Sequence, residues 1–150
     1  MSRAVLELRQ PVAAPAEVVW AEVVDWPAQG EWMLGTRVEV AEGDGASVGS
    51  EVAAFTGIGP VGFLDTMVVT AWDPPRECRV DHTGKVVQGI GVFRVEARGA
   101  RESVFVWREE LDLPLGALGR LGWPLVRPGF ALGVKYSLRK LARRCEARAR

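Results

Sequence analysis

The chain is poor in the residues that build metal sites and disulfide frameworks. Its 150 residues include two cysteines, one histidine and one tyrosine, and the formal net charge at pH 7 is zero. Cys78 and Cys145 stand alone, without a Cys-x-x-Cys or Cys/His spacing, which argues against a zinc site and against a disulfide. No apolar run approaches the roughly 18 residues of a membrane-spanning helix, and Glu7 and Arg9 interrupt the first segment. We therefore expect two packed or surface thiols, no secretory signal and a cytoplasmic location.

The charge is unevenly distributed along the chain. Residues 135–150 carry seven basic side chains and a single acidic one, Glu146. This segment is either a patch for nucleic acid or an anionic membrane, or a solvated helix face whose cations suit the negative end of the helix dipole. Because the remainder of the chain is net negative and would repel phosphate, we expect the second alternative, with no nucleic-acid partner and no stable membrane insertion.

The length fits one domain over residues 1–150, with a core that needs no disulfide or metal. Residues 3–10 alternate as a half-buried strand does, and 14–25 begin with Pro15 and an early Glu17, which predicts a helix with one buried face. Residues 31–34 predict a further helical turn. Short runs rich in Val, Phe, Thr and Trp then predict six antiparallel strands, at 36–42, 49–56, 63–72, 76–83, 86–97 and 103–113.

The last part of the chain has two different sequence patterns. Residues 114–129 mix leucine with glycine and proline, which predicts a lid-like loop or a broken helical turn carrying Trp123 and Leu125. From Phe130 to Cys145 apolar residues recur at intervals of three and four, which predicts an amphipathic helix of about five turns. Only this long helix can cover the sheet, so the sheet must curl around it and leave room for a small ligand.

Several segments resemble the START-like, or SRPBCC, superfamily, which includes Bet v 1 relatives, polyketide cyclase/dehydratases and lipid-transfer domains. The segments are 14–20 (APAEVVW), 25–27 (DWP), Trp32, 73–76 (DPPR), 104–109 (VFVWRE) and the closing helix. The resemblance spans nearly the whole chain. It implies an α+β helix-grip fold, a curved antiparallel sheet around a long C-terminal helix with two short helices after the first strand. It also implies a cavity between sheet and helix, and identifies no catalytic residue.

The sequence contains no complete catalytic or cofactor motif. The segment 57–62 (GIGPVG) matches the dinucleotide glycine pattern, but a strand rather than a helix follows it, so a hairpin turn explains the glycines and we expect no cofactor. His82, the only histidine, is either a solvated hairpin residue, which we favour, or a general base. Tyr136 either packs with its hydroxyl in solvent, the favoured alternative, or reaches the pocket edge.

Glu109 is the third candidate for acid–base chemistry. It shares a strand face with Phe105 and Trp107, so it enters the cavity if the aromatic face points inward. Otherwise it is a surface carboxylate paired across the sheet, for instance with Arg94. The pattern alone does not settle which face is inner.

We therefore expect a protein that binds an apolar or aromatic molecule, such as a lipid, a polyketide-like compound or a quinone, as a monomer or homodimer. The expected ligand-binding residues are Phe55, Val68, Phe93, Trp107, Trp123, Leu125, Phe130, Val134, Leu138 and Leu141. Two alternatives stay open: a polyketide cyclase/dehydratase using Glu109, His82 or Tyr136, and a protein-interaction module of the cochaperone type.

Overall fold

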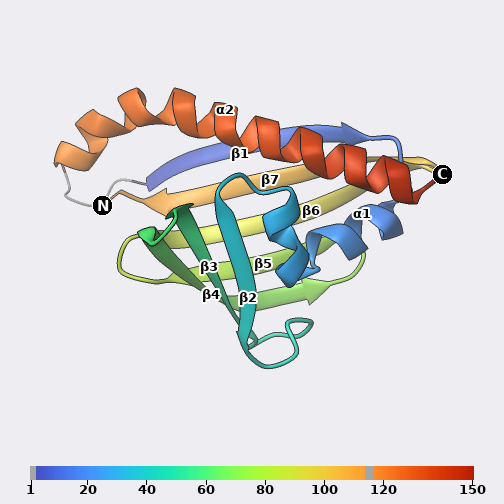
Figure 1. Cartoon of the computed structure of the whole chain (residues 1–150), viewed down its shortest axis with the longest axis horizontal. Coiled ribbons are helices and arrows are strands. Elements are labelled where there is room, and N and C mark those ends of the chain that lie inside the picture. The colour runs from blue at the N-terminus through green and yellow to red at the C-terminus, as the bar shows by residue number, and fades with distance from the viewer. Residues whose placement is uncertain (1–2, 114–116) are drawn as a thin grey trace.

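The computed structural model describes residues 3–113 and 117–150 and has an α+β architecture (Figure 1). In chain order the elements are β1 (Arg3–Val12), α1 (Ala16–Val23), the 3-10 helix η1 (Trp26–Glu31), β2 (Thr36–Glu42), β3 (Glu51–Ile58), β4 (Val61–Asp73), β5 (Glu77–Thr83), β6 (Gln88–Gly99), β7 (Glu102–Asp112) and α2 (Ala117–Arg148). The predicted helix-grip fold, with its strand, two helices, six strands and closing helix, is confirmed.

The strands form one antiparallel sheet in the order β1-β7-β6-β5-β4-β3-β2. Strands β2 to β7 are joined as successive hairpins, and β1 returns beside β7 to close the other edge. The glycine pattern at 57–62 is the β3–β4 hairpin, in which Gly59 has φ +59, a conformation that favours glycine. Figure 1 shows the sheet curving so that its concave face lies under α2.

Helix α2 is much longer than the sequence pattern indicates. The expectation of a loop or broken turn over 114–129 is wrong from Ala117 onward, where the chain is helical, and Pro114–Gly116 lie outside the described residues. Pro124 and Pro128 lie inside this helix. Each removes one backbone hydrogen bond and favours a bend, which weakens the local helical signal without ending the helix.

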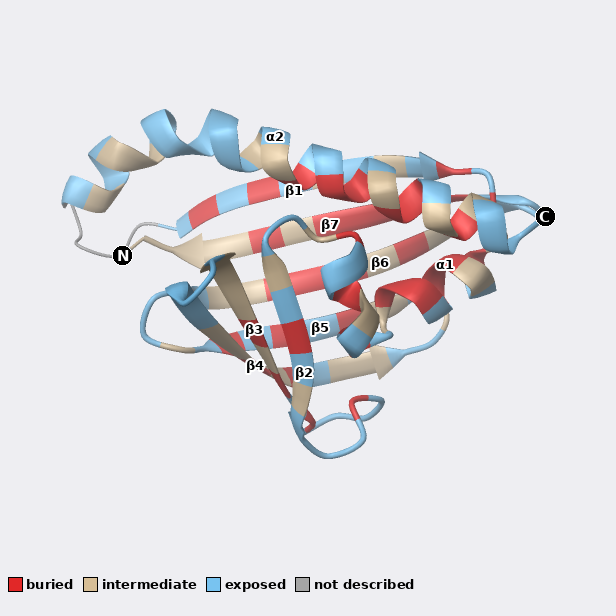
Figure 2. Cartoon of the chain, viewed as in Figure 1, coloured by how far each residue is buried: buried red, intermediate tan, exposed pale blue. Residues whose placement is uncertain are grey.

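The core fills only one part of the space between sheet and helices. Inward side chains such as Val69, Val80 and Phe105 belong to one buried cluster with Leu138 and Leu141 of α2, and all five are at most 1% exposed. Figure 2 shows the buried residues on the C-terminal half of α2 and on α1, whereas the N-terminal half of α2 is mostly exposed. The solid core therefore lies under the second half of α2.

A buried carboxylate ties α1 to α2. Glu22 is 1% exposed and accepts hydrogen bonds from Arg144 Nε at 2.6 Å and Arg148 Nη1 at 2.5 Å. Burial alone would raise the pKa of Glu22, but the two guanidinium groups outweigh it and hold the pKa below its usual 4.5. Part of the basic C-terminal segment, expected to be a solvated face, is thus engaged within the protein.

We predict that Glu22→Gln lowers the free energy of unfolding at pH 7 by about 2 kcal/mol, because two charge-assisted hydrogen bonds lose their anion. The folded pKa of Glu22 is depressed, so this stabilisation is present above the unfolded pKa and is lost as pH falls through the folded pKa. Urea denaturation of both proteins from pH 7 into acid should show the difference shrinking. The exposed Glu39→Gln is the control, and an equal effect of both substitutions would contradict the prediction.

Candidate functional site

A cavity of about 280 Å³ lies between the concave face of the sheet and the middle of α2. Apolar side chains make up most of its wall, from the segment after η1, from the sheet and from α2; they include Met33, Met67, Phe93, Trp107, Phe130 and Val134. Two glycines of α2, Gly129 and Gly133, also line it. Because a glycine leaves the space beside the helix empty, these positions keep the cavity open under α2.

Four of the ten expected ligand-binding residues line this cavity, namely Phe93, Trp107, Phe130 and Val134. Trp107 and Phe130 face each other, with ring centroids 6.0 Å apart. They come from β7 and α2, so this aromatic pair joins the sheet wall to the helix wall.

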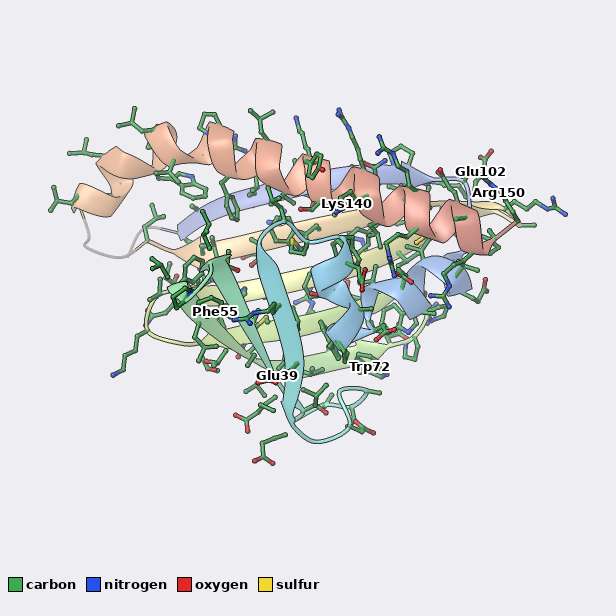
Figure 3. All side chains as sticks on the ribbon, viewed as in Figure 1. Glu39, Phe55, Trp72, Glu102, Lys140 and Arg150 are labelled. Atoms are coloured by element: carbon green, nitrogen blue, oxygen red, sulfur yellow. The ribbon has the colours of Figure 1, made fainter. Side chains whose placement is uncertain are left out.

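The other six lie elsewhere, for three reasons. Phe55, labelled in Figure 3, and Val68 belong to the convex face, since Ala54 and Met67 beside them turn inward. Leu138 and Leu141 are buried in the core one or two turns beyond the cavity. Trp123 and Leu125 lie on α2, which is helical where a loop was expected, and neither lines the cavity. Trp123 lies beside Phe130 with ring centroids 6.2 Å apart, and Leu125 is 84% exposed.

Three ionisable side chains converge on the sheet side of the cavity. His82 Nδ1 lies 2.8 Å from Asp65 Oδ1, and His82 Nε2 lies 2.7 Å from Glu109 Oε2. The side chains of Asp65, His82 and Glu109 are 16%, 3% and 6% exposed. An imidazole with a carboxylate on each nitrogen, in a predominantly apolar wall, is the chemical feature that distinguishes this cavity.

The register of the sheet brings these groups together. His82 is on β5 and Glu109 on β7, so strand β6 runs between them, and Gly91 of β6 pairs with Glu109. A Cβ at Gly91 would lie 3.3 Å from His82 Nε2 and 3.2 Å from Glu109 Oε1. The missing side chain at Gly91 therefore lets the two groups meet across an intervening strand.

The network shifts the pKa values of its members. Burial would lower the pKa of His82, but hydrogen bonds and charges from Asp65 and Glu109 outweigh burial and raise it to about 10. Burial raises the pKa of Glu109, with the nearby negative charge of Asp65 acting in the same direction and His82 opposing both. Perturbed pKa values of interacting groups in one cavity are typical of a functional site.

The structure settles the alternatives that the pattern left open for the three candidate residues. Glu109 faces the cavity, and Arg94 lies on the other face with Glu77 and Glu96. The favoured alternative of a solvated hairpin histidine is wrong, because His82 faces inward and is 8% exposed. Tyr136 is 52% exposed on α2 and does not line the cavity, so it stays outside the network.

The sequence analysis did not select Asp65 or Gly91. The available signal was an aspartate that alternates with Phe63 and Met67 on a strand otherwise rich in apolar residues. A glycine inside a β-strand likewise indicates close approach of other groups. Neither signal names its partner, because the contact depends on register across three strands.

Other reactive chemistry is absent from the described ranges 3–113 and 117–150. No group of three or more His, Cys, Asp or Glu residues there has the geometry to hold a metal ion. Burial raises the pKa of Cys78 and Cys145 to about 12, so neither thiol is an activated nucleophile. The cavity thus offers the three ionisable groups for acid–base chemistry and a largely apolar wall for binding.

Solved structures similar to this one share its fold at low sequence identity. The aromatase/cyclase Zhui from a Streptomyces species has a TM-score of 0.82 at 17% identity, covering 99% of this chain and 97% of that one. The protein TTHA0849 from Thermus thermophilus has a TM-score of 0.80 at 17% identity, covering 98% and 100%. Norcoclaurine synthase from Thalictrum flavum, in complex with dopamine and hydroxybenzaldehyde, has a TM-score of 0.67 at 17% identity, covering 93% and 86%.

No curated protein sequence matches the chain. A family model does match, over residues 3–146, which is nearly the whole chain and includes every strand, both sides of the cavity and the three ionisable groups. The chain therefore belongs to the family described as polyketide cyclase / dehydrase and lipid transport.

Proposed function

We propose that the protein binds an apolar ring compound in the cavity and catalyses the loss of water from it, a reaction of the cyclase/dehydratase type. The observation that carries this proposal is the buried Asp65–His82–Glu109 network on the wall of an apolar cavity. A site that only held an apolar molecule would gain nothing from burying three ionisable groups, because each costs desolvation free energy.

The volume of the cavity favours a compact ligand. Pockets for drug-sized molecules begin at roughly 300 Å³, and an apolar cavity of about 150 Å³ holds one benzene ring. The 280 Å³ here therefore suits a ligand of two or three rings. A lipid with two long chains would not fit inside it.

The network holds one proton that is ready for transfer. In either protonation form Nδ1–H of His82 donates to Asp65, and one proton lies between Nε2 and Glu109 Oε2, 2.7 Å apart. The raised pKa of His82 favours an imidazolium, whereas burial of Glu109 favours a neutral acid. Both forms carry the same total charge, so the proton can shift without creating a new charge in the apolar wall.

This arrangement provides both an acid and a base for eliminating water from a β-hydroxy ketone. The carboxylate of Glu109 takes the proton on the carbon between carbonyl and hydroxyl, and the C–H electrons form the new double bond. The C–O bond breaks, and the hydroxide leaves as water with a proton supplied from His82. The network keeps its proton count, because Glu109 gains one proton as His82 gives one up, and transfer of a proton from Glu109 to His82 resets the site. When the ring already carries the other double bonds, tautomerisation of the product completes an aromatic system.

The comparisons support an aromatic ligand for the proposal. A structure with the same fold is named an aromatase/cyclase, and another holds dopamine and hydroxybenzaldehyde. The cavity offers matching side chains, since Phe93, Trp107 and Phe130 line it. Rings stacked or packed edge to face gain free energy beyond their burial.

A carrier without chemistry is the second candidate, favoured by the predominantly apolar wall and by the lipid-transport part of the family description. In a carrier the polar network would only orient an oxygen atom of the ligand. The two candidates differ in turnover rather than in binding.

The protonation of His82 is directly measurable because it is the only histidine. We predict that its imidazole NMR signals titrate near pH 10, and that Asp65→Asn lowers this pKa because one partner charge is lost. Since the folded pKa is raised, the linked stabilisation is complete below the unfolded value of 6.5 and declines as pH rises toward 10. Titration near 6.5 in the wild-type protein would show that the network does not form.

The reaction is testable with 3-hydroxy-α-tetralone, a bicyclic β-hydroxy ketone that loses one water to give fluorescent α-naphthol. We predict acceleration by the wild-type protein and a fall of about 100-fold or more in Glu109→Gln and His82→Gln. Glu109→Gln should also weaken α-naphthol binding about tenfold while leaving naphthalene binding unchanged, since one hydrogen bond to the hydroxyl is altered.

The matched control is Glu110→Gln, the same exchange on the next residue of β7, whose side chain pairs with Arg108 on the opposite face. Binding of α-naphthol without turnover would favour the carrier. Failure to bind either aromatic compound would overturn the proposed ligand class.

Filling the cavity should abolish binding without unfolding the protein. Gly133 lines the cavity, and a Cβ placed there meets only Leu34 Cδ2, at 3.9 Å. We predict that Gly133→Leu raises the melting temperature by about 3 °C through its helix propensity and eliminates α-naphthol binding. Gly122→Leu, on the same helix and outside the cavity, should give a similar thermal shift and retain binding; equal binding by both variants would contradict the assigned pocket.

A further inference from the structure

The outer face of α2 carries a row of exposed leucines. Leu118, Leu121, Leu125 and Leu132 are 69%, 73%, 84% and 67% exposed. Their spacing of three, four and seven residues places them along one stripe of a helix. We call these four residues the leucine stripe.

The stripe points away from the cavity. Phe130 and Val134 mark the inner side of α2, because both line the cavity. At 3.6 residues per turn, the leucine stripe lies on roughly the opposite side of the helix. Figure 2 shows this half of α2 mostly exposed, in contrast to the half that covers the core.

Single exposed leucines are common, but a contiguous stripe of four indicates an interaction surface. Removing these four side chains from water would therefore stabilise a complex formed through this face.

The same face becomes basic along the helix. Lys135, Arg139 and Arg143 are exposed and continue the outer side of α2 toward its C-terminus. From Ala117 to Cys145 the helix contains no aspartate or glutamate. The partner of this face must therefore accept apolar side chains and several cations together.

We propose that the outer face of α2 docks onto an anionic lipid bilayer, with the leucine stripe at the acyl boundary and the cations among the phosphates. A helix with apolar side chains on one face and Lys and Arg beside them binds in this way, parallel to the membrane. Among the described residues, no helix is long and apolar enough to cross a bilayer. The inference concerns an interaction surface and does not depend on the proposed reaction.

Charge favours a bilayer over a second copy of the chain. Two copies meeting through this face would bring Lys135, Arg139 and Arg143 of each into the same interface, with no acidic residue on α2 before Glu146 to neutralise them. An anionic bilayer supplies both the apolar layer and the opposite charge. Docking would also bring the cavity, lined by the inner side of the same helix turns, close to a source of apolar molecules.

The test is co-sedimentation of the full chain with vesicles of phosphatidylcholine containing phosphatidylglycerol, beside vesicles of phosphatidylcholine alone. We expect binding to the anionic vesicles that weakens as salt is added. Leu121→Ser and Leu125→Ser should each lower the partition coefficient about tenfold, and Arg139→Gln and Arg143→Gln each about fivefold.

Two controls match these exchanges elsewhere on the surface. Val48→Ser removes an apolar side chain that is 65% exposed in the loop between β2 and β3, away from α2 in Figure 1. Arg101→Gln removes an exposed cation between β6 and β7. Both should bind vesicles like the wild-type protein, and unchanged melting temperatures show that every variant is folded.

Three results would overturn the inference. They are no binding to anionic vesicles, binding that the leucine exchanges leave unchanged, and a solution dimer, by analytical ultracentrifugation, that Leu125→Ser converts to a monomer. The last result would assign the stripe to a second copy of the chain.

Discussion

The bond between His82 and Glu109 across strand β6 is the constraint on which the site depends. Neighbouring strands lie about 4.8 Å apart, so residues on β5 and β7 are roughly 10 Å apart at the backbone. Their side chains meet at 2.7 Å because both are long and because Gly91 leaves the space between them empty. Any side chain at Gly91 would crowd this bond, and a separated Glu109 would be a buried carboxyl group without its imidazole partner.

This bond also explains why the cavity and the core occupy different halves of the molecule. A polar network needs room on one side for a ligand oxygen or water, whereas Leu138 and Leu141 fill the space under the second half of α2 completely. The Glu22 ion pairs fix that second half to α1. The rest of α2 can then lie over the cavity without filling it, since the position of the helix is already set by its other end.

Sequence reasoning predicted the fold well because alternation along strands and the three- and four-residue spacing after Phe130 are local signals. The start of α2 was not predicted, because Pro124 and Pro128 are typical of a helix break in a sequence. In the structure both prolines lie inside the helix. For the site, an aromatic strand face pointed to Glu109 and Trp107, but the pattern left inner and outer faces equivalent. His82 was misjudged because a position near a strand end resembles a turn until the curvature of the sheet is known.

The first half of α2 shows why apolar content alone does not indicate burial. On its inner side Gly133 leaves space over the cavity, and on its outer side Leu121 and Leu125 are exposed to solvent. A helix that only covered a core would have the reverse arrangement, with leucines inside and small or polar residues outside. This reversed arrangement is explained if both sides of α2 contact an apolar partner, a ring compound in the cavity on the inner side and a lipid bilayer on the outer side. One helix then forms the wall of the cavity and the contact with the bilayer, so the two surfaces are separated only by the thickness of α2.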